Sequence, residues 1–239
     1  MLVDRKRMIE HLTKIYTSNQ IKEAVLTEAF SCNALNADGQ LLIVAPSLKG
    51  IEPLPEPVGL VDVDLFISAL KSLSSSDEVA VDFEDERILV DSRHGGRIRL
   101  LTAATNLIQS AVKQETVDKV LETVPDKAPE VPLSQDVIKG VLDACSLVKP
   151  EIITLKVGKK ASEFVVGQTT GHYVEHDLPA KTAKGEQPYE LIFAAKLVID
   201  VFRQLTDYTS TKITLTGPDS IVVVSEGAYR YVISPQEPA

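Results

Sequence analysis

The stretch VDVDLFISALKSLSSSDEVAVDFEDERILVDSRHGGRIRLLTA, residues Val61–Ala103, has a counterpart later in the same chain. That counterpart is FAAKLVIDVFRQLTDYTSTKITLTGPDSIVVVSEGAYRYVIS, residues Phe193–Ser234. Both stretches begin with an apolar run, which is followed by a polar break and then by three segments whose pattern is typical of strands. The matched apolar positions are Leu65 with Leu197, Ile67 with Ile199, Leu70 with Phe202, Val79 with Ile213, and Val90 with Val224. The pattern predicts a unit of one helix and three strands that occurs twice.

The length of the chain fits two copies of one domain. Its 239 residues, 44% of them hydrophobic, are enough for two domains of about 100–120 residues, each with its own core. Between the copies, Pro125, Pro129 and Pro132 interrupt a segment with only short helical patterns. We therefore predict a first domain over residues 1–110, a linker over 111–132 and a second domain over 133–239.

Composition narrows the class of protein. The net charge of −9 argues against a basic nucleic-acid-binding domain. Cys32 and Cys145 lie in apolar patterns, so we expect buried, reduced thiols and a cytoplasmic location. The N-terminus is charged from Asp4 onward, which is unlike a secretory signal, and no apolar run is long enough to span a membrane.

Each half is expected to hold two short helices and several antiparallel strands. In the first half, we expect helices at Arg5–Tyr16 and Asp64–Leu73. On the first of these helices, Arg7, Glu10, His11 and Lys14 should face outward. The expected strands are Val25–Asn33, Gln40–Ala45, Val58–Val63, Glu78–Phe83, Arg87–Asp91 and Gly96–Thr102. In the second, we expect a helix capped by Ser134, a helix at Ala194–Leu205, and strands at Glu151–Val157, Ser162–Gly167, Gly171–Leu178 and Gln187–Phe193, before those of the second repeat. The predicted class is α+β, because no βαβ spacing indicates a parallel sheet.

This duplicated pattern resembles the two-domain DNA sliding clamps, which are proliferating-cell nuclear antigen and the phage clamps. The resemblance rests on the helix and three strands of each half, the segment ILVDSR (Ile88–Arg93) and the closing AYRYVISP (Ala228–Pro235), and the phage form is the more similar. It implies a homotrimeric ring, with helices lining the hole and sheets outside, that encircles duplex DNA and tethers a replicative polymerase. It also implies an ATP-dependent clamp loader as partner, and no catalytic residue, metal or cofactor; a phage-encoded clamp would work in the host cytoplasm.

The charge layout agrees with such a ring. The predicted strands between Asp77 and Asp91 carry seven acids and one base, whereas residues 5–14 carry four bases and one acid. Positive side chains attract DNA phosphates without reading sequence, which permits sliding. The predicted DNA-binding residues are Arg5, Lys6, Arg7, Lys14, Lys71, Lys139, Lys196 and Arg203. The alternative is that these are ordinary solvated helix faces, and Asp136, Asp143 and Asp200 on the same helices weaken the charge argument.

Partners of clamps insert an apolar peptide near the interdomain linker and the C-terminal tail. The matching residues here are Leu107, Ile108, Val112, Tyr229, Tyr231, Ile233 and Pro235. A tyrosine can bury its ring and still form a hydrogen bond through its hydroxyl. The alternative is that at least one of the residues Tyr229, Tyr231 and Ile233 packs into the second core.

Two other functions compete with the clamp. The first is a clamp-like interaction scaffold that does not encircle DNA. The second is a metallohydrolase, because His172–His176 spells H-x-x-E-H, an inverted zinc-protease order that requires a helix. Gly171, Pro179 and the Tyr-Val pair favour a strand instead, on which the two histidines would stand about 13 Å apart, too far to share one zinc ion.

Overall fold

The structure is a computed structural model of the 239-residue chain. It describes residues 1–73, 77–84, 86–92, 96–167, 171–179, 187–218 and 220–236. Asp85, Arg93 at the end of the ILVDSR segment, and the His94-Gly95 part of the predicted turn lie outside these residues.

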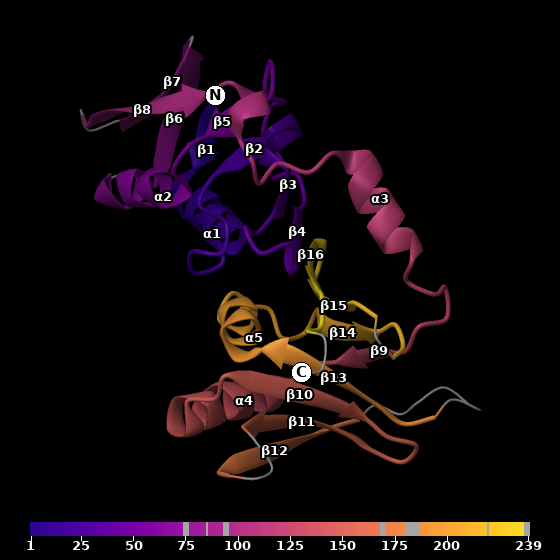
Figure 1. The fold of residues 1–239 in the computed structure, drawn as a ribbon. Helices are drawn as coiled ribbons and strands as arrows, with labels where there is room; N and C mark the ends of the chain where they lie inside the picture. The colour runs from indigo at the N-terminus through magenta and orange to yellow at the C-terminus, as the bar shows by residue number, and fades with distance from the viewer. Residues whose placement is uncertain are drawn as a thin grey trace. The chain divides into compact units, whose positions relative to one another are not determined.

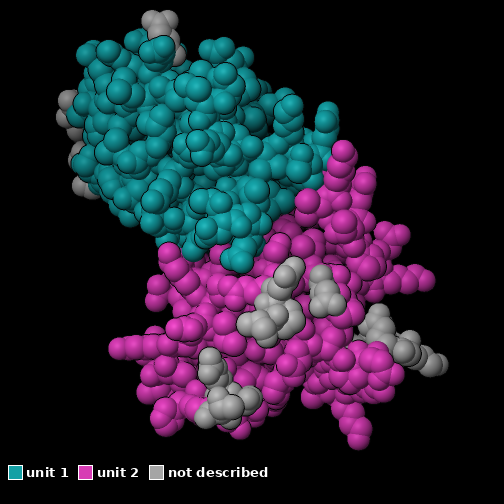
Figure 2. Space-filling model, viewed as in Figure 1, with its two compact units in different colours: residues 1–117 teal, residues 118–239 magenta. Residues whose placement is uncertain are grey.

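The chain divides into two compact units, Met1–Val117 and Asp118–Ala239 (Figure 2). The boundary falls within a helix, α3, that spans Gln114–Glu122. The predicted linker, residues 111–132, contains this helix and a short strand, β9, at Glu130–Pro132. The linker segment is therefore largely regular structure.

Unit 1 consists of antiparallel strands and two main helices (Figure 1). Its elements are β1 (Leu2–Asp4), α1 (Arg5–Tyr16), β2 (Ala24–Leu26), the 3₁₀ turn η1 (Glu28–Phe30), β3 (Cys32–Leu35), β4 (Leu41–Ala45), β5 (Val58–Leu60), α2 (Val63–Ser72), β6 (Glu78–Glu84), β7 (Arg87–Ser92), β8 (Arg97–Ala103) and the 3₁₀ turn η2 (Thr105–Leu107). Its main sheet has the order β1-β6-β7-β8-β5-β2, and β3 and β4 form a hairpin. The helices α1 and α2 pack against each other.

Unit 2 repeats this arrangement. Its elements after α3 and β9 are α4 (Gln135–Val148), β10 (Ile152–Val157), β11 (Ser162–Gly167), β12 (Tyr173–Leu178), β13 (Tyr189–Ala194), α5 (Ala195–Phe202), β14 (Thr211–Leu215), β15 (Val222–Glu226) and β16 (Tyr229–Ile233). One antiparallel group has the order β12-β11-β10-β13 and the other the order β16-β15-β14-β9. The helix α4 lies on β11 and β12, and α5 on β10 and β13.

The order of elements confirms the internal repeat. From β1 and from β9 alike, the chain runs through one strand, a helix, four strands, a helix and three strands. Each repeated unit is thus longer than the stretch that first revealed it, because the preceding strands and helix also recur. All strand pairs registered among the described residues are antiparallel, so the α+β class is confirmed.

Side chains fix where the first helix of each unit begins. Asp4 accepts a hydrogen bond from the N–H of Arg7 at the start of α1, and Ser134 accepts one from Val137 at the start of α4. Such caps satisfy N–H groups that have no partner within the helix. The predicted cap at Ser134 is therefore confirmed, and α1 has the predicted bounds.

Both cores are mainly aliphatic, as the composition indicates. Met8, Leu12 and Phe66 are buried between the helices and the sheet of unit 1. In unit 2, Phe164 and Phe202 meet edge-to-face with ring centroids 5.7 Å apart. Apolar burial of this extent is the main stabilising contribution to each unit.

The prediction of one strand over residues 25–33 is wrong. The chain breaks there into β2, η1 and β3, because Ala29 and Phe30 adopt positive φ values of 45° and 66°. Residues with a Cβ rarely adopt this conformation, and neither glycine nor asparagine marks the position.

Among the described residues, no helix combines the length and the apolar character that a membrane crossing requires.

Candidate nucleic-acid interface and partner groove

The first helix buries more polar residues than its apolar stripe predicts. His11 and Lys14 were expected to face outward, but they are 1% and 6% exposed, and Arg5 is 9% exposed. The outward-facing prediction is confirmed for Arg7 and Glu10, which are exposed. It is wrong for His11 and Lys14, because α1 packs against both α2 and β4, which widens its buried face beyond one stripe. The Arg5 guanidinium donates to the carbonyl of Leu70 on α2, over 3.4 Å. Arg5 and Lys14 therefore do not present their charges to solvent.

The other six bases of the predicted DNA-binding set are exposed. They are Lys6 and Arg7 on α1, Lys71 on α2, Lys139 on α4, Lys196 on α5 and Arg203 directly after α5. The only ion pair among them within the described residues joins Lys6 to Asp77 over 3.6 Å, with both side chains largely exposed. A pair of this kind is screened by solvent and leaves the lysine available for other anions.

Four exposed acids accompany these bases on the helices, namely Glu10, Asp64, Asp136 and Asp143. Within the bounds of α1, α2, α4 and α5, five exposed bases stand against these four acids, a net charge of +1 on a chain whose total is −9. The negative charge of Asp200 does not oppose the bases on the solvent face of α5, because this residue is only 4% exposed. The helical faces are thus positive relative to the rest of the molecule.

The sheet of unit 1 is acidic on its solvent side. Asp77 precedes β6, and Glu78, Asp82 and Glu84 lie on it; all four are exposed. On β7 and β8, Asp91 accepts two hydrogen bonds from Arg97, at 2.6 and 3.0 Å, and these hold the pKa of the Asp91 carboxyl below its usual value. Negative strands and more positive helices are the distribution that the sequence indicates.

The predicted partner-binding residues differ in exposure. Leu107 is 67% exposed, whereas Ile108 is only 5% exposed. Residues 108–112 run beside β3, where the N–H of Leu35 donates to Ser110 and that of Val112 donates to Asn33. At the other segment, Tyr231 and Ile233 are buried, which confirms that at least one of these residues packs into the core; Tyr229, Val112 and Pro235 are half-exposed. Burial raises the pKa of the Tyr231 phenol well above its usual value.

A groove of about 360 Å³ lies within unit 2, between the chain that leaves α3 and the outer side of β14 and β15. Its lining residues are Leu121, Val124, Pro125, Asp126, Ala128, Glu130, Lys212, Thr214, Val223, Ser225, Gly227 and Arg230. Leu121 and Val124 come from the helix α3 and its end, so an apolar wall faces a largely polar floor. The apolar spacing of residues 117–124 indicates a helix, but it could not show that the following chain lies over this sheet.

The floor of the groove offers polar groups to a ligand. The Ser225 hydroxyl is buried and has no hydrogen-bond partner among the described residues. Beside it, Lys212 and Glu130 form an ion pair of 2.6 Å across β14 and β9. Arg230, which also lines the groove, is exposed and can donate hydrogen bonds to a ligand. The groove therefore combines an apolar wall with an exposed hydrogen-bond donor.

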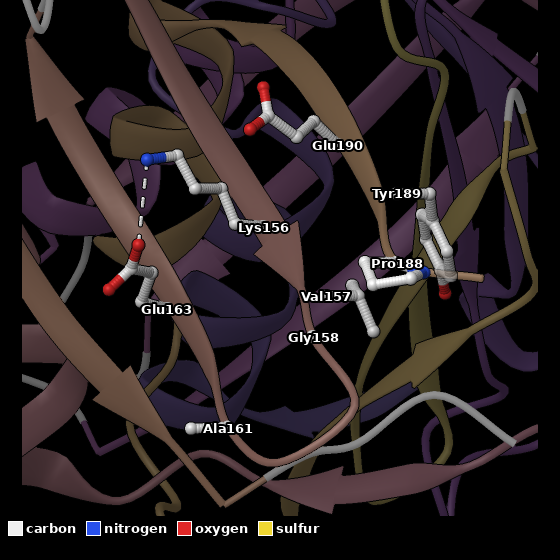
Figure 3. A pocket seen from close by; sticks show the side chains of 8 residues that line it. All are labelled: Lys156, Val157, Gly158, Ala161, Glu163, Pro188, Tyr189 and Glu190. Atoms are coloured by element: carbon white, nitrogen blue, oxygen red, sulfur yellow. Dashed lines mark ion pairs between the residues drawn. The ribbon is translucent and has the colours of Figure 1, made fainter.

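A second cavity, of about 390 Å³, lies where β10, β11 and β13 approach one turn (Figure 3). Lys156 and Glu163 form an ion pair of 3.5 Å at its side, and Glu190 adds another carboxylate. None of the residues lining this cavity belongs to either predicted set. With two carboxylates and one ammonium, the lining has a net charge of −1, which does not suit an anionic ligand.

The H-x-x-E-H segment forms the predicted strand. Tyr173–Leu178 is β12, and His172 precedes it. The His176 ring lies under α4, and a Cβ built on Gly140 would stand 2.6 Å from its Cε1 atom. The segment therefore lacks the helical geometry that the zinc-protease motif requires.

No family model matches the chain, and no curated protein sequence matches it. Solved structures do match over its whole length. The Thermococcus kodakaraensis PCNA is similar with a TM-score of 0.69 and 14% identity, covering 99% of both chains. The A. fulgidus PCNA, solved with the C-terminal region of FEN-1, gives a TM-score of 0.72 at 11% identity and covers 98% of that chain.

Bacterial clamps match as well. The DNA polymerase III subunit beta from Pseudomonas aeruginosa gives a TM-score of 0.72 at 15% identity, and the chain spans 65% of its length. These likenesses show that the chain has the sliding-clamp fold, which confirms the fold expected from the repeat. The particular similarity to phage clamps stays a prediction, because these three structures are archaeal and bacterial.

Proposed function

We propose that the chain is a DNA polymerase sliding clamp, a processivity factor that encircles duplex DNA and performs no catalysis. The observation that carries this proposal is the fold itself, two units of equal element order that match PCNA chains over nearly their full length. The exposed bases on all four main helices add support, since they suit a surface that faces DNA phosphates.

In this proposal, copies of the chain join head-to-tail into a homotrimeric ring, with the helices of both units toward the DNA. Residues 1–110 and 133–239 act as two copies of one clamp domain, joined by residues 111–132. A DNA polymerase and an ATP-dependent clamp loader are the expected partners. Six exposed bases, Lys6, Arg7, Lys71, Lys139, Lys196 and Arg203, form the DNA-facing set; Arg5 and Lys14 leave it because they are buried.

The groove in unit 2 is the proposed docking site for a partner peptide. An apolar side chain of the peptide would lie against Leu121 and Val124, while its backbone carbonyls accept from the exposed Arg230 guanidinium. Within unit 2, the accessible Tyr229 and Pro235 stay proposed partner contacts, and within unit 1 the accessible Leu107 and Val112 do. Replacing Val124 with Asp would place a charge on the apolar wall, which should abolish polymerase stimulation while leaving the mass of the assembly unchanged.

Encirclement is tested by retention of the protein on DNA with blocked ends, and not by the affinity of the protein for DNA. The protein is threaded onto linear duplex DNA with free biotinylated ends, and the ends are then capped with streptavidin. After washing at about 0.5 M salt, where phosphate attraction is strongly screened, a closed ring should stay on capped DNA. A restriction cut that opens the DNA should release it.

The outcome distinguishes the two functions that the fold allows. Release from capped and uncapped DNA alike would remove the clamp function. A protein that bound a polymerase peptide but was never retained on capped DNA would instead be a clamp-like interaction scaffold.

A further inference from the structure

One carboxylate of unit 1 binds a segment that lies far from it in the sequence. The Oε1 atom of Glu23 accepts hydrogen bonds from the N–H of Gln109, over 2.6 Å, and from that of Ser110, over 3.3 Å. In return, the Ser110 hydroxyl donates to the backbone carbonyl of Glu23 over 2.6 Å. Hydrogen bonds that a carboxylate accepts are among the stronger ones in proteins. Glu23 therefore joins two parts of the chain that are 86 positions apart.

The backbone of Glu23 is itself fixed on both sides. The carbonyl of Lys22 accepts a hydrogen bond of 2.8 Å from the N–H of Val63, which begins α2. Ala24 begins β2 and pairs with Leu60 of β5. The carboxylate is thus attached to the start of a strand and lies next to the start of a helix, so it has a defined origin from which to hold another segment.

The segment that this carboxylate binds also lies on the edge of β3. It consists of residues 108–112 and is called the anchored segment below. The N–H of Leu35 donates to the carbonyl of Ser110 over 2.8 Å, and the N–H of Val112 donates to the carbonyl of Asn33 over 3.1 Å. The bridge between the two strands is antiparallel. Because each such hydrogen bond contributes only a modest net stabilisation, a ladder this short depends on the further bonds from the carboxylate.

The anchored segment lies between two accessible apolar side chains. Its first residue, Ile108, is 5% exposed and packs over β5, where a Cβ on Gly59 would stand 3.1 Å from the Ile108 Cγ1 atom. Leu107, directly before it, is 67% exposed, and Val112 at its end is half-exposed. Leu107 and Val112 are the proposed partner contacts of unit 1, so the anchored segment decides where both of them stand.

We propose that Glu23 is a positioning residue for partner docking, which holds the anchored segment on β3 so that Leu107 and Val112 meet a partner in a fixed geometry. A surface that is already ordered loses less conformational entropy on binding than a mobile one, and this raises affinity. The inference rests on the proposed function for the partner. The anchoring itself follows from the hydrogen bonds within unit 1.

Amide hydrogen exchange tests the anchoring. In Glu23→Ala, the N–H groups of Gln109 and Ser110 lose their acceptor and should exchange at least about tenfold faster than in the wild type. An unchanged far-UV circular dichroism spectrum should show that the variant is folded. Equal exchange rates at Gln109 and Ser110 in both proteins would overturn the anchoring.

Two conservative variants separate hydrogen-bond geometry from charge. Glu23→Gln keeps an acceptor oxygen at the same reach and loses the charge, so its exchange rates should stay within about threefold of the wild type. Glu23→Asp keeps the charge but is shorter by one methylene group, so it should resemble Glu23→Ala. The opposite order would contradict the proposed contact. Glu52→Ala, which removes the same charge from an exposed residue between β4 and β5, should leave the exchange rates unchanged.

A nitroxide label on Leu107→Cys tests whether Glu23 positions this residue. The natural thiols should stay unlabelled, because burial raises the pKa of Cys32 to about 12 and that of Cys145 to about 11. The electron paramagnetic resonance spectrum should gain a mobile component in Glu23→Ala and lose it again in Glu23→Gln. Identical spectra in all three backgrounds would show that Glu23 does not position residue 107.

The functional readout uses a DNA polymerase that the wild type stimulates. Glu23→Ala should raise the protein concentration for half-maximal stimulation at least about threefold and leave the maximum unchanged, because a mobile contact surface weakens docking and not the reaction of the polymerase. Glu23→Gln should restore the wild-type concentration. A lowered maximum at an unchanged half-maximal concentration would contradict a positioning role.

The two proposals fail separately. Faster exchange at Gln109 and Ser110 in Glu23→Ala, with a wild type that capped DNA never retains, would remove the clamp function and leave the anchoring intact. Retention of the wild type on capped DNA, with exchange that Glu23→Ala does not change, would leave the clamp function and remove the anchoring.

Discussion

At the scale of single residues, the pKa of His11 is strongly perturbed. Its ring is 1% exposed, and its Nε2 atom lies 2.7 Å from the carbonyl oxygen of Phe30, which can only accept. The Nε2–H therefore donates, which fixes one neutral tautomer. Burial, with a smaller contribution from Lys14, lowers the pKa of His11 to about 4 despite this hydrogen bond.

This pKa predicts a dependence of stability on pH. Between pH 6.5 and about 4 the unfolded chain binds the proton and the folded chain does not, so the free energy of unfolding falls as pH falls. The contribution is fully present above pH 6.5, and its loss by pH 4 should amount to about 3 kcal/mol. Urea unfolding of the wild type and of His11→Gln at pH 7 and pH 4 measures it. Equal losses in both proteins would show that His11 is not the titrating group.

A second residue-scale prediction concerns Glu226, a carboxylate 3% exposed at the end of β15. Its Oε1 atom accepts hydrogen bonds from the N–H of Thr206, over 2.7 Å, and from that of Asp207. Glu226→Ala should lower the free energy of unfolding by about 1–3 kcal/mol, because two part-buried N–H groups are left without their acceptor. Glu226→Gln keeps an acceptor oxygen and should cost less. Equal urea midpoints for Ala and Gln would mean that the acceptor is unimportant.

At the scale of elements, the contact of α4 with β12 depends on one glycine. A Cβ at Gly140 would stand 2.6 Å from Cε1 and 2.8 Å from Nδ1 of His176. Alanine normally stabilises a helix relative to glycine by about 0.5–1 kcal/mol, but here the contact must open. We expect Gly140→Ala to lower the free energy of unfolding by about 1 kcal/mol.

The background variant His176→Ala supplies the control. With the ring removed, Gly140→Ala should become stabilising, so the sign of its effect should reverse in a double-mutant cycle measured by thermal unfolding. If Gly140→Ala still lowered the free energy of unfolding in the His176→Ala background, the destabilisation would have a cause other than the contact between α4 and β12.

Local pattern predicted most elements, because each repeated helix and strand carries its own periodicity. The helix Arg5–Tyr16 and the strand Ser162–Gly167 have the predicted bounds. Helix α2 begins and ends one residue before the predicted bounds, where the N–H of Leu65 bonds to Asp62. The turn at Ala29 and Phe30 escaped prediction because its positive φ angles involve neither glycine nor asparagine.

The candidate site was only partly predictable, because it depends on which elements pack together. Helical spacing identifies which face of a helix is apolar, but not how many neighbours it packs against, so the burial of Lys14 and Arg5 was missed. The groove over β14 and β15 depends on residues that lie far apart in the chain, and no local pattern connects Leu121 with Ser225.

At the scale of the whole molecule, the six exposed bases make a quantitative prediction for DNA. Alanine at Lys6, Arg7, Lys71, Lys139, Lys196 and Arg203 together should weaken binding to linear duplex. The slope of log affinity against log salt should decrease by about 0.9 for each phosphate that the variant no longer neutralises, while the assembled mass stays the same.

The matched control removes the same charge from elsewhere. Alanine at six exposed lysines outside these helices, Lys22, Lys49, Lys113, Lys127, Lys159 and Lys160, should leave the slope nearly unchanged. Equal slopes for both variants, measured by fluorescence titration, would show that net charge, and not the helical face, governs DNA binding.

The head-to-tail joint of the proposed ring has a consequence for purity and storage. A copy joined in this way can accept a neighbour at both ends, and the joint itself contains no feature that limits the number of copies. Only closure of the circle consumes both ends. Any change that alters the angle between neighbours should therefore convert closed particles into filaments of indefinite length, visible as turbidity that grows with protein concentration.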